Sequence, residues 1–213
     1  MSEIQHIAIT GGIGSGKSYV CRMLSEAYGI NVYDCDAAAK RLMRTSEELR
    51  RKLTNLIGPD AYVTASDCAS VQSANTGLSA GSSPAYMLNK AAIARFLLLS
   101  EANAKAIDNI VHPAVAADFL ASGMTWLESA ILFQSGFNTR VHFDTVVLVS
   151  APEDVRVERI MKRDNLSREK AQQWIDRQWT QDELRKRADY EIINDGHTPL
   201  LPQIEKIILN LNH

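Results

Sequence analysis

A glycine-rich stretch near the beginning of the chain combines residue types that bind phosphate groups. It fits the spacing G-x-x-x-x-G-K-[ST] without a mismatch, and we call it the P-loop: Gly11, Gly12, Ile13, Gly14, Ser15, Gly16, Lys17 and Ser18. Glycines let the backbone curl so that successive N–H groups point at phosphate oxygens, and a following helix adds its positive N-terminal end. The lysine can reach the β and γ phosphates of a nucleotide, and the serine hydroxyl is the expected Mg²⁺ ligand. The alternative is a glycine-rich turn that binds nothing.

Carboxylates follow two predicted strands and could act on an acceptor hydroxyl. Asp34 and Asp36 come after a predicted strand at residues 30–33, and Glu128 comes after another at 125–127. Carboxylates at i and i+2 of an extended segment point the same way, so one could serve the hydroxyl and the other magnesium-bound water. We assign the role of base to Asp36. The alternatives are that Asp34 caps the following helix and that Glu128 is an ordinary carboxylate at a strand end.

Basic residues outnumber acidic ones between Arg156 and Arg187. Arg156, Arg159 and Arg163 have the spacing i, i+3 and i+7, which places them on one face of a helix. They could converge on a triphosphate from the side opposite the P-loop, where developing phosphoryl charge calls for such donors. For any single arginine, a solvated helix face is the alternative.

The elements that would position these groups alternate between strand and helix. A short apolar strand at residues 7–9 precedes the P-loop, and a helical pattern follows it as far as Gly29. The near-continuous apolar run at 143–149 is typical of a strand buried on both faces, which predicts a parallel sheet. Thr180 and Glu183 have the spacing of a helix capping box, and a last strand is predicted at 190–193. A final helix is predicted to bury one stripe: Leu201, Ile204, Ile208 and Leu211.

One segment has no periodic pattern. From about Thr64 to Ala85 the chain is rich in Ser, Ala, Gly, Asn and Thr and has almost no charge, which predicts an extended loop. Helical patterning returns around Asn89 and continues past His112 and Pro113.

Composition excludes several classes of protein. The 213 residues are 46% hydrophobic and 23% charged, as in an ordinary globular protein. A net charge of −2 supplies no excess cationic field for a nucleic acid or an anionic membrane. Three cysteines without paired spacing argue against a disulfide framework or a structural zinc site, so we expect a cytoplasmic protein.

The sequence lacks a motif that GTPases usually contain. Guanine recognition usually brings an N-K-x-D sequence, and Asn89-Lys90 is followed here by two alanines. The P-loop therefore points away from a GTPase.

Several blocks together resemble the dephospho-CoA kinase family. In chain order they are the P-loop with the preceding Ile9-Thr10, Val32-Tyr33-Asp34-Cys35-Asp36, His112-Pro113, Leu132-Phe133, Arg159, Arg163-Asp164, Gln178, Ala188-Asp189 and Asn194-x-Gly196. The resemblance runs from about residue 4 to residue 209 and is interrupted mainly by the Ser/Ala-rich segment. Ordered blocks of this kind are much more specific than a P-loop alone.

The resemblance implies an α/β protein with the three-layer P-loop kinase fold and a five-stranded parallel sheet. The core would comprise about residues 1–36 and 125–213, with a lid at about 153–187 and a helical acceptor-binding lobe at about 37–124. The implied activity is ATP-dependent phosphorylation of the ribose 3′-hydroxyl of dephospho-CoA, the final step of coenzyme A synthesis. ATP and dephospho-CoA would be the small-molecule substrates of a monomer that uses Mg²⁺ and binds neither nucleic acid nor membrane.

Residue roles carry over position by position. Residues 14–19, which include Tyr19, would hold the ATP phosphates, and Asn194 would lie near the adenine. Asp36 would be the base, and Arg159 and Arg163 would belong to the lid. The acceptor side would comprise four residues: Asp34, Lys90, His112 and Pro113.

The sequence also departs from the family pattern. Tyr19 replaces a usual Thr, Lys90 a usual Arg, Glu128 a usual Asp and Gln134 a usual Glu, and Leu184 stands where many members have Lys. Because Lys17, Ser18, Asp36 and Arg163 are all present, we expect activity to survive. Another small-acceptor P-loop kinase, or a nucleotide-dependent switch protein, remains as an alternative reading of the same residues.

Overall fold

The computed structural model describes residues 5–64 and 86–211, which form two compact units. The first unit comprises Met1–Cys35 and Phe119–His213, and the second comprises Asp36–Asp118. Phe119, at the start of the second segment of the first unit, is fully buried, and its ring contacts Tyr33 of the same unit, with ring centroids 5.2 Å apart.

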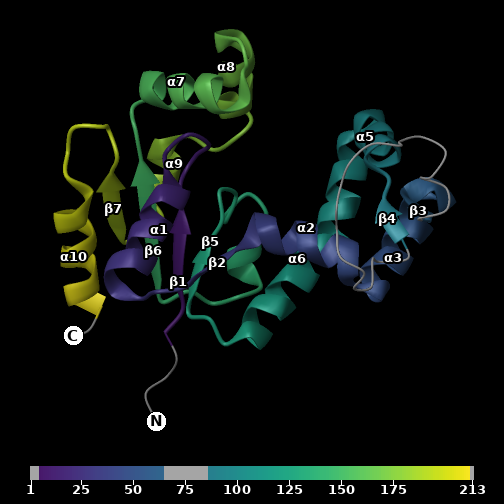
Figure 1. Ribbon diagram of the computed structural model, residues 1–213, viewed down its shortest axis with the longest axis horizontal. Helices are drawn as coiled ribbons and strands as arrows, with labels where there is room; N and C mark the ends of the chain where they lie inside the picture. Colours follow the sequence, from purple (N-terminus) through teal and green to yellow (C-terminus); the bar gives the residue numbers. More distant parts are fainter. Residues whose placement is uncertain (1–4, 65–85, 212–213) are drawn as a thin grey trace, which may run out of the picture. The chain divides into compact units, whose positions relative to one another are not determined.

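A five-stranded sheet forms the centre of the first unit, and all its strands are parallel (Figure 1). In spatial order its strands are β2 (Val32–Asp34), β5 (Trp126–Glu128), β1 (Ile7–Thr10), β6 (Thr145–Ser150) and β7 (Tyr190–Ile193). The parallel sheet predicted from the apolar run before Ser150 is confirmed. Every residue of β6 after Thr145 is buried, as expected for a strand covered on both faces.

Helices pack on the sheet according to the alternation of side chains along the strands. Ile7 and Ile9 of β1 point to one face, where they pack with α1 (Lys17–Tyr28) and α10 (Leu200–Leu211). Ala8, between them, is buried on the opposite face. On α10 the buried positions are Ile204 and Ile207, whereas Leu201 is 49% exposed. The predicted α10 stripe was therefore wrong at Leu201, one residue inside the helix start.

Three helices occupy the region predicted as the lid: α7 (Glu153–Asp164), α8 (Arg168–Asp176) and α9 (Gln181–Arg185). The first two pack on each other through a small apolar cluster of Val157, Ile160, Ala171 and Ile175. Ile13 of the P-loop packs against the same cluster. The P-loop therefore packs on both of these helices.

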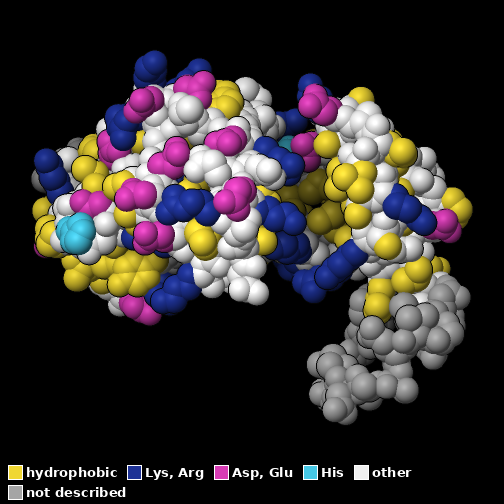
Figure 2. Space-filling view, turned by 90° about the horizontal axis from the view of Figure 1, so that it is seen from above, with side chains coloured by type: hydrophobic (Ala, Val, Ile, Leu, Met, Phe, Trp, Pro, Cys, Tyr) yellow, Lys and Arg dark blue, Asp and Glu magenta, His cyan; other side chains and the backbone are white. Residues whose placement is uncertain are grey.

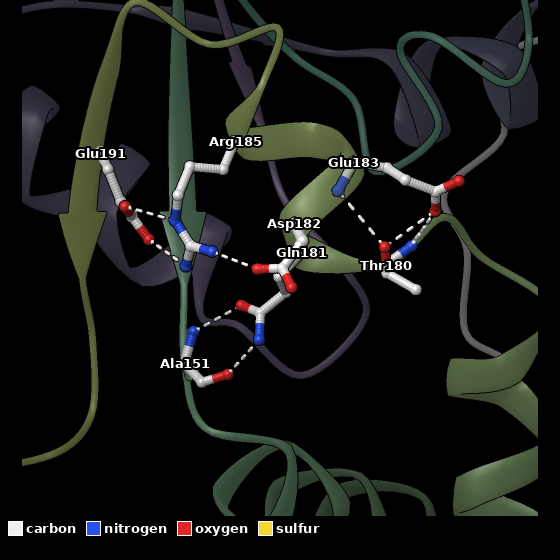
Figure 3. Close-up of polar contacts among 7 residues, drawn as sticks. All are labelled: Ala151, Thr180, Gln181, Asp182, Glu183, Arg185 and Glu191. Atoms are coloured by element: carbon white, nitrogen blue, oxygen red, sulfur yellow. Dashed lines mark hydrogen bonds and ion pairs between the residues drawn. The ribbon is translucent and has the colours of Figure 1, made fainter.

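Polar side chains bond α9 to Ala151, directly after β6, and to Glu191 of β7 (Figure 3). The Gln181 amide accepts from the Ala151 N–H at 2.9 Å and donates to the Ala151 carbonyl at 2.6 Å. Arg185 donates twice to Glu191 at 2.8 Å and also pairs with Asp182, and its guanidinium lowers the pKa of Glu191. The predicted capping box of Thr180 is confirmed.

Replacing Thr180 with alanine is expected to lower the free energy of unfolding by about 1 kcal/mol, because the hydroxyl satisfies a helix N–H that is otherwise unpaired. Urea unfolding measures this loss. Thr180→Ser retains the hydroxyl and is the matched control. Equal stability of the alanine and serine variants would contradict the prediction.

The second unit is mainly helical. Its helices are α2 (Cys35–Thr45), α3 (Glu47–Ile57), α5 (Lys90–Leu99) and α6 (Glu101–Ser122), of which the first begins and the last ends in the first unit. Asn89 caps α5 by accepting from the Ala92 N–H at 3.2 Å. Strands β3 (Tyr62–Thr64) and β4 (Tyr86–Leu88) pair antiparallel, which the sequence patterns did not predict. The intervening 65–85, most of the predicted extended loop, lie outside the described residues.

Acidic and basic side chains are interspersed on the face of the first unit that Figure 2 shows, in keeping with a net charge of −2. No helix in the described part of the chain is both long enough and apolar enough to cross a membrane.

Candidate active site

The P-loop connects β1 to α1 and needs glycine at specific positions. Gly16 has φ +93°, and a Cβ atom there would lie 2.1 Å from Nδ2 of Asn194. A Cβ atom on Gly11 would lie 2.2 Å from the backbone oxygen of Val149. Since neither approach leaves room for a side chain, the strand-loop-helix conformation depends on these glycines.

The carbonyl groups of the P-loop are held by side chains from two other parts of the first unit. Arg156 Nε donates to the Ile13 carbonyl at 2.9 Å, and Asn194 Nδ2 donates to that of Ser15 at 2.8 Å. Arg159 donates to the carbonyls of Gly14 at 3.4 Å and Ser15 at 3.3 Å. The N–H and C=O groups of a peptide point in opposite directions, so these bonds orient the corresponding N–H groups away from the two arginines. Fixing donors before a ligand arrives is what an anion site requires.

The three arginines of α7 do not converge on one point. Arg156 and Arg159 contact the P-loop backbone, and Arg159 also donates to Oδ1 of Asn194 at 3.3 Å. Arg163 instead pairs with Asp164 at 2.7 Å and its side chain is 60% exposed. The i to i+7 spacing separates Arg156 from Arg163 by roughly 10 Å along the helix. The two side chains therefore lie on one face of α7 but contact different groups.

Arg156 is the buried member of this group. Burial lowers the pKa of its guanidinium, although Glu153 acts in the opposite direction, and a guanidinium stays charged at neutral pH. Within residues 5–64 and 86–211, three buried side-chain nitrogen or oxygen atoms lack a hydrogen-bond partner: Arg156 Nη2, Ser15 Oγ and Thr10 Oγ1. All three belong to the P-loop, the end of β1 or the arginine behind them, and such unsatisfied groups concentrate at functional sites.

Glu128 lies beside the cationic end of the P-loop. Its Oε1 is 4.0 Å from Lys17 Nζ, and Ser18 Oγ donates to its Oε2 at 3.5 Å. Both members of the Lys17–Glu128 pair are largely buried, with side chains 8% and 14% exposed. The strand register places Glu128 next to Ile9 on one side and Asp34 on the other. Glu128 is therefore part of the site and more than an ordinary carboxylate at a strand end.

Cys21 adjoins the same carboxylate. Its Sγ is 3.9 Å from Glu128 Oε2. Burial and then the charge of Glu128 raise the pKa of this thiol. Because the thiolate is the reactive form, this raised pKa makes Cys21 less reactive than a free thiol.

The two aspartates of the D-x-D pattern lie on different elements. Asp34 is the last residue of β2, whereas Asp36 is the second residue of α2. The expectation that both point the same way from an extended segment was therefore wrong, because the helix begins at Cys35. Asp36 lies in the first turn of α2, where the helix dipole stabilises a negatively charged carboxylate.

The remaining predicted residues occupy both units. Tyr19 is exposed on α1, with the Arg22 guanidinium 5.0 Å from its ring centroid. Lys90 is the exposed first residue of α5, and Pro113 is exposed within α6. His112 Nε2 lies 3.6 Å from Asp108 Oδ1 one turn earlier in α6.

Sequence reasoning gave no role to two glutamines that contact this region. Gln178 Oε1 accepts from the Ile13 N–H of the P-loop at 2.6 Å. Gln134 bonds the backbone on both sides of Gln178. The sequence signals were the place of Gln178 among the blocks that resemble the family and that of Gln134 among the departures from its pattern, because no local pattern links either residue to Ile13.

Comparison with known proteins agrees with this geometry. The family model for dephospho-CoA kinase matches residues 5–67 and 83–199, so the unmatched gap lies inside the Ser/Ala-rich segment. Dephospho-CoA kinase of Bacteroides fragilis strain YCH46 is 37% identical over 95% of this chain and 90% of its own length. The Porphyromonas gingivalis enzyme is 38% identical over 95% of this chain and 92% of its own length.

Solved structures agree as well. A crystal structure of a Thermus thermophilus protein covers 97% of both chains with 31% identity and a TM-score of 0.74. Because the matches extend from the P-loop to the elements that hold it and continue through the second unit, this chain belongs to the dephospho-CoA kinase family.

Proposed function

We propose that this protein transfers the γ-phosphoryl group of ATP to the ribose 3′-hydroxyl of dephospho-CoA, giving coenzyme A and ADP. The observation that carries the proposal is the P-loop whose carbonyls are held by Arg156, Arg159 and Asn194. Family membership supplies the identity of the acceptor.

On the donor side, the P-loop amides and the N-terminus of α1 bind the phosphates of ATP. Lys17 supplies a point charge to the β and γ phosphates, as its place in the motif requires. Arg159 and Arg163 supply positive charge from α7, and Arg159 does so from behind the loop, where it bonds the carbonyls of Gly14 and Ser15. Asn194 lies near the adenine end of the nucleotide.

On the acceptor side, Asp36 accepts the proton of the 3′-hydroxyl as the new P–O bond forms. The second unit is the acceptor-binding lobe, and α7 to α9 form the lid. Four residues bind dephospho-CoA: Asp34, Lys90, His112 and Pro113. Lys90 offers its phosphate a single charged point, which replaces the bidentate contact that an arginine would make.

The residues around Ser18 fit Mg²⁺. Its hydroxyl and the Glu128 carboxylate, 3.5 Å apart, are oxygen donors of the kind that a hard cation prefers. Ser18 would hold the ion, with Glu128 beside it. When bound, Mg²⁺ neutralises charge on the transferring phosphoryl group.

We place the enzyme in the cytoplasm as a monomer that acts on small molecules. A near-neutral net charge of −2 supports a substrate held by local contacts, with no role for a nucleic acid or a membrane surface.

The test is ADP release from ATP, coupled to a fluorescent or absorbance readout, with and without dephospho-CoA. We expect release only when dephospho-CoA is present, and mass spectrometry should show one added phosphoryl group on the acceptor. The 3′-deoxy analogue of dephospho-CoA is the matched control and should give no turnover.

Other outcomes point elsewhere. ADP release that does not depend on any acceptor would indicate a slow nucleotide-hydrolysing switch. Turnover with nucleosides or small alcohols, and none with dephospho-CoA, would indicate a different small-acceptor kinase.

A further inference from the structure

The N–H group of Ile13, at the tip of the P-loop, is bonded by a side chain far away in the sequence. Gln178 Oε1 accepts from it at 2.6 Å. The carbonyl of the same residue accepts from Arg156, so both polar groups of Ile13 are fixed by side chains of the lid region. Because an N–H group can only donate, the oxygen of the Gln178 amide must face the loop.

Gln134 fixes the backbone on both sides of Gln178. Its Oε1 accepts from the Trp179 N–H at 3.0 Å, and its Nε2 donates to the Arg177 carbonyl at 3.2 Å. This use of both amide atoms needs glutamine, since a glutamate could accept from Trp179 but could not donate to Arg177. Gln134 itself does not contact the P-loop through any bond among the described residues.

Ring contacts also hold the short segment of residues 177–181, which contains Gln178. Trp179 stacks on Phe133, with centroids 6.0 Å apart and planes inclined by 7°. The Arg187 guanidinium lies 4.5 Å from the centroid of the Trp179 ring. Downstream, the Gln181 amide bonds both backbone groups of Ala151 (Figure 3). The segment 177–181 is thus anchored on both sides of Gln178.

We propose that Gln178 is a positioning residue that keeps the P-loop in its anion-binding conformation, and that Gln134 acts through it. The Gln178 bond holds the tip of the loop at Ile13, and the arginine and asparagine bonds hold its carbonyls. Gln134 has no direct effect on the nucleotide and sets only where Gln178 lies. The inference rests on the use of ATP proposed above.

The experiment measures binding of ADP with Mg²⁺ by calorimetry, because the β-phosphate occupies the P-loop whatever the acceptor is. Gln178→Met removes the acceptor atom at similar volume and should weaken binding about five- to tenfold, the effect of one lost hydrogen bond. Gln134→Met should weaken binding about threefold, a smaller loss because the ring contacts and Gln181 remain. The double variant should match Gln178→Met alone, since two residues that act through one contact are not additive.

Steady-state kinetics distinguish a specific effect on the P-loop from a general loosening of the protein. The KM for ATP should rise in the Gln178 variants while the KM for the acceptor stays unchanged. Gln134→Glu keeps the bond from Trp179 and should recover most of the affinity. Gln172→Met is the matched control, because Gln172 joins Glu153 of α7 to Asp176 of α8 at 3.0 Å each and does not bond the P-loop.

Three results would overturn the proposal: unchanged ADP affinity in Gln178→Met, multiplicative effects in the double variant, or an equal loss in Gln172→Met. Thermal melting verifies that each variant is folded, and Gln178→Asn, which is too short to reach Ile13, replaces the methionine variant if that one does not fold. Wild-type protein that binds ADP but leaves dephospho-CoA unmodified would refute the proposed acceptor and leave this test intact.

Discussion

Lys17→Ala is expected to lower kcat for dephospho-CoA phosphorylation by about 10³-fold or more, the scale for removing a key charge from a phosphoryl transition state. Lys17 Nζ lies 4.0 Å from Glu128 Oε1 and 3.5 Å from the Gly12 carbonyl, at the junction of the P-loop and α1. Negative charge shifts between the β and γ phosphates during transfer, and Lys17 is the only positively charged side chain of the P-loop that can stabilise it.

Turnover should be measured with ATP and dephospho-CoA both in excess, so that weaker binding is separated from slower chemistry. Because Lys17 is largely buried beside Glu128, circular dichroism and thermal melting must accompany the assay. Lys206→Ala, at an exposed position of α10, is the matched control and should retain wild-type turnover. A folded Lys17→Ala protein with normal kcat would remove the P-loop lysine from the mechanism.

Asp36→Asn should lower kcat and kcat/KM together by about 10²-fold or more, the range for a positioned general base, while leaving ATP affinity near normal. Asparagine has almost the shape of aspartate and cannot accept the hydroxyl proton in the same way. Asp36 follows the end of β2, whose last residue is in register with Glu128 at the carboxyl ends of the strands. ATP itself is bound by the P-loop, so its affinity reports on a different set of residues.

Three further aspartate and glutamate variants make this prediction specific. Asp34→Asn should change the dependence on Mg²⁺ more than the chemical step. Asp60→Asn, at an exposed position of the second unit, should behave as wild type. If Asp36→Asn turns over normally and Glu128→Gln is inactive, the base is Glu128, which the structure already places beside Lys17.

Local features of the site could be read from the sequence. The P-loop, its flanking strand and helix, and the capping box of Thr180 involve residues a few positions apart, so residue type and spacing are enough to predict them. The parallel sheet followed from the apolar run of β6, because only a strand covered on both faces tolerates such a run. The pairing of β3 with β4 was missed because those three-residue strands are separated by residues 65–85, with no turn motif to join them.

By itself, the sequence determined that a phosphate-binding loop is present, which residues compose it and which carboxylates and arginines accompany it. Only the tertiary structure decided how those groups are used: Arg156 and Arg159 hold loop carbonyls, Arg163 pairs with Asp164, and Glu128 adjoins Lys17. The bond between Ile13 and Gln178 joins residues 165 positions apart, and no local periodicity encodes such a contact. It exists because α7 and α8 pack against Ile13 and so bring the turn after α8 to the P-loop, where side chains meet according to the fold and not according to their spacing in the chain.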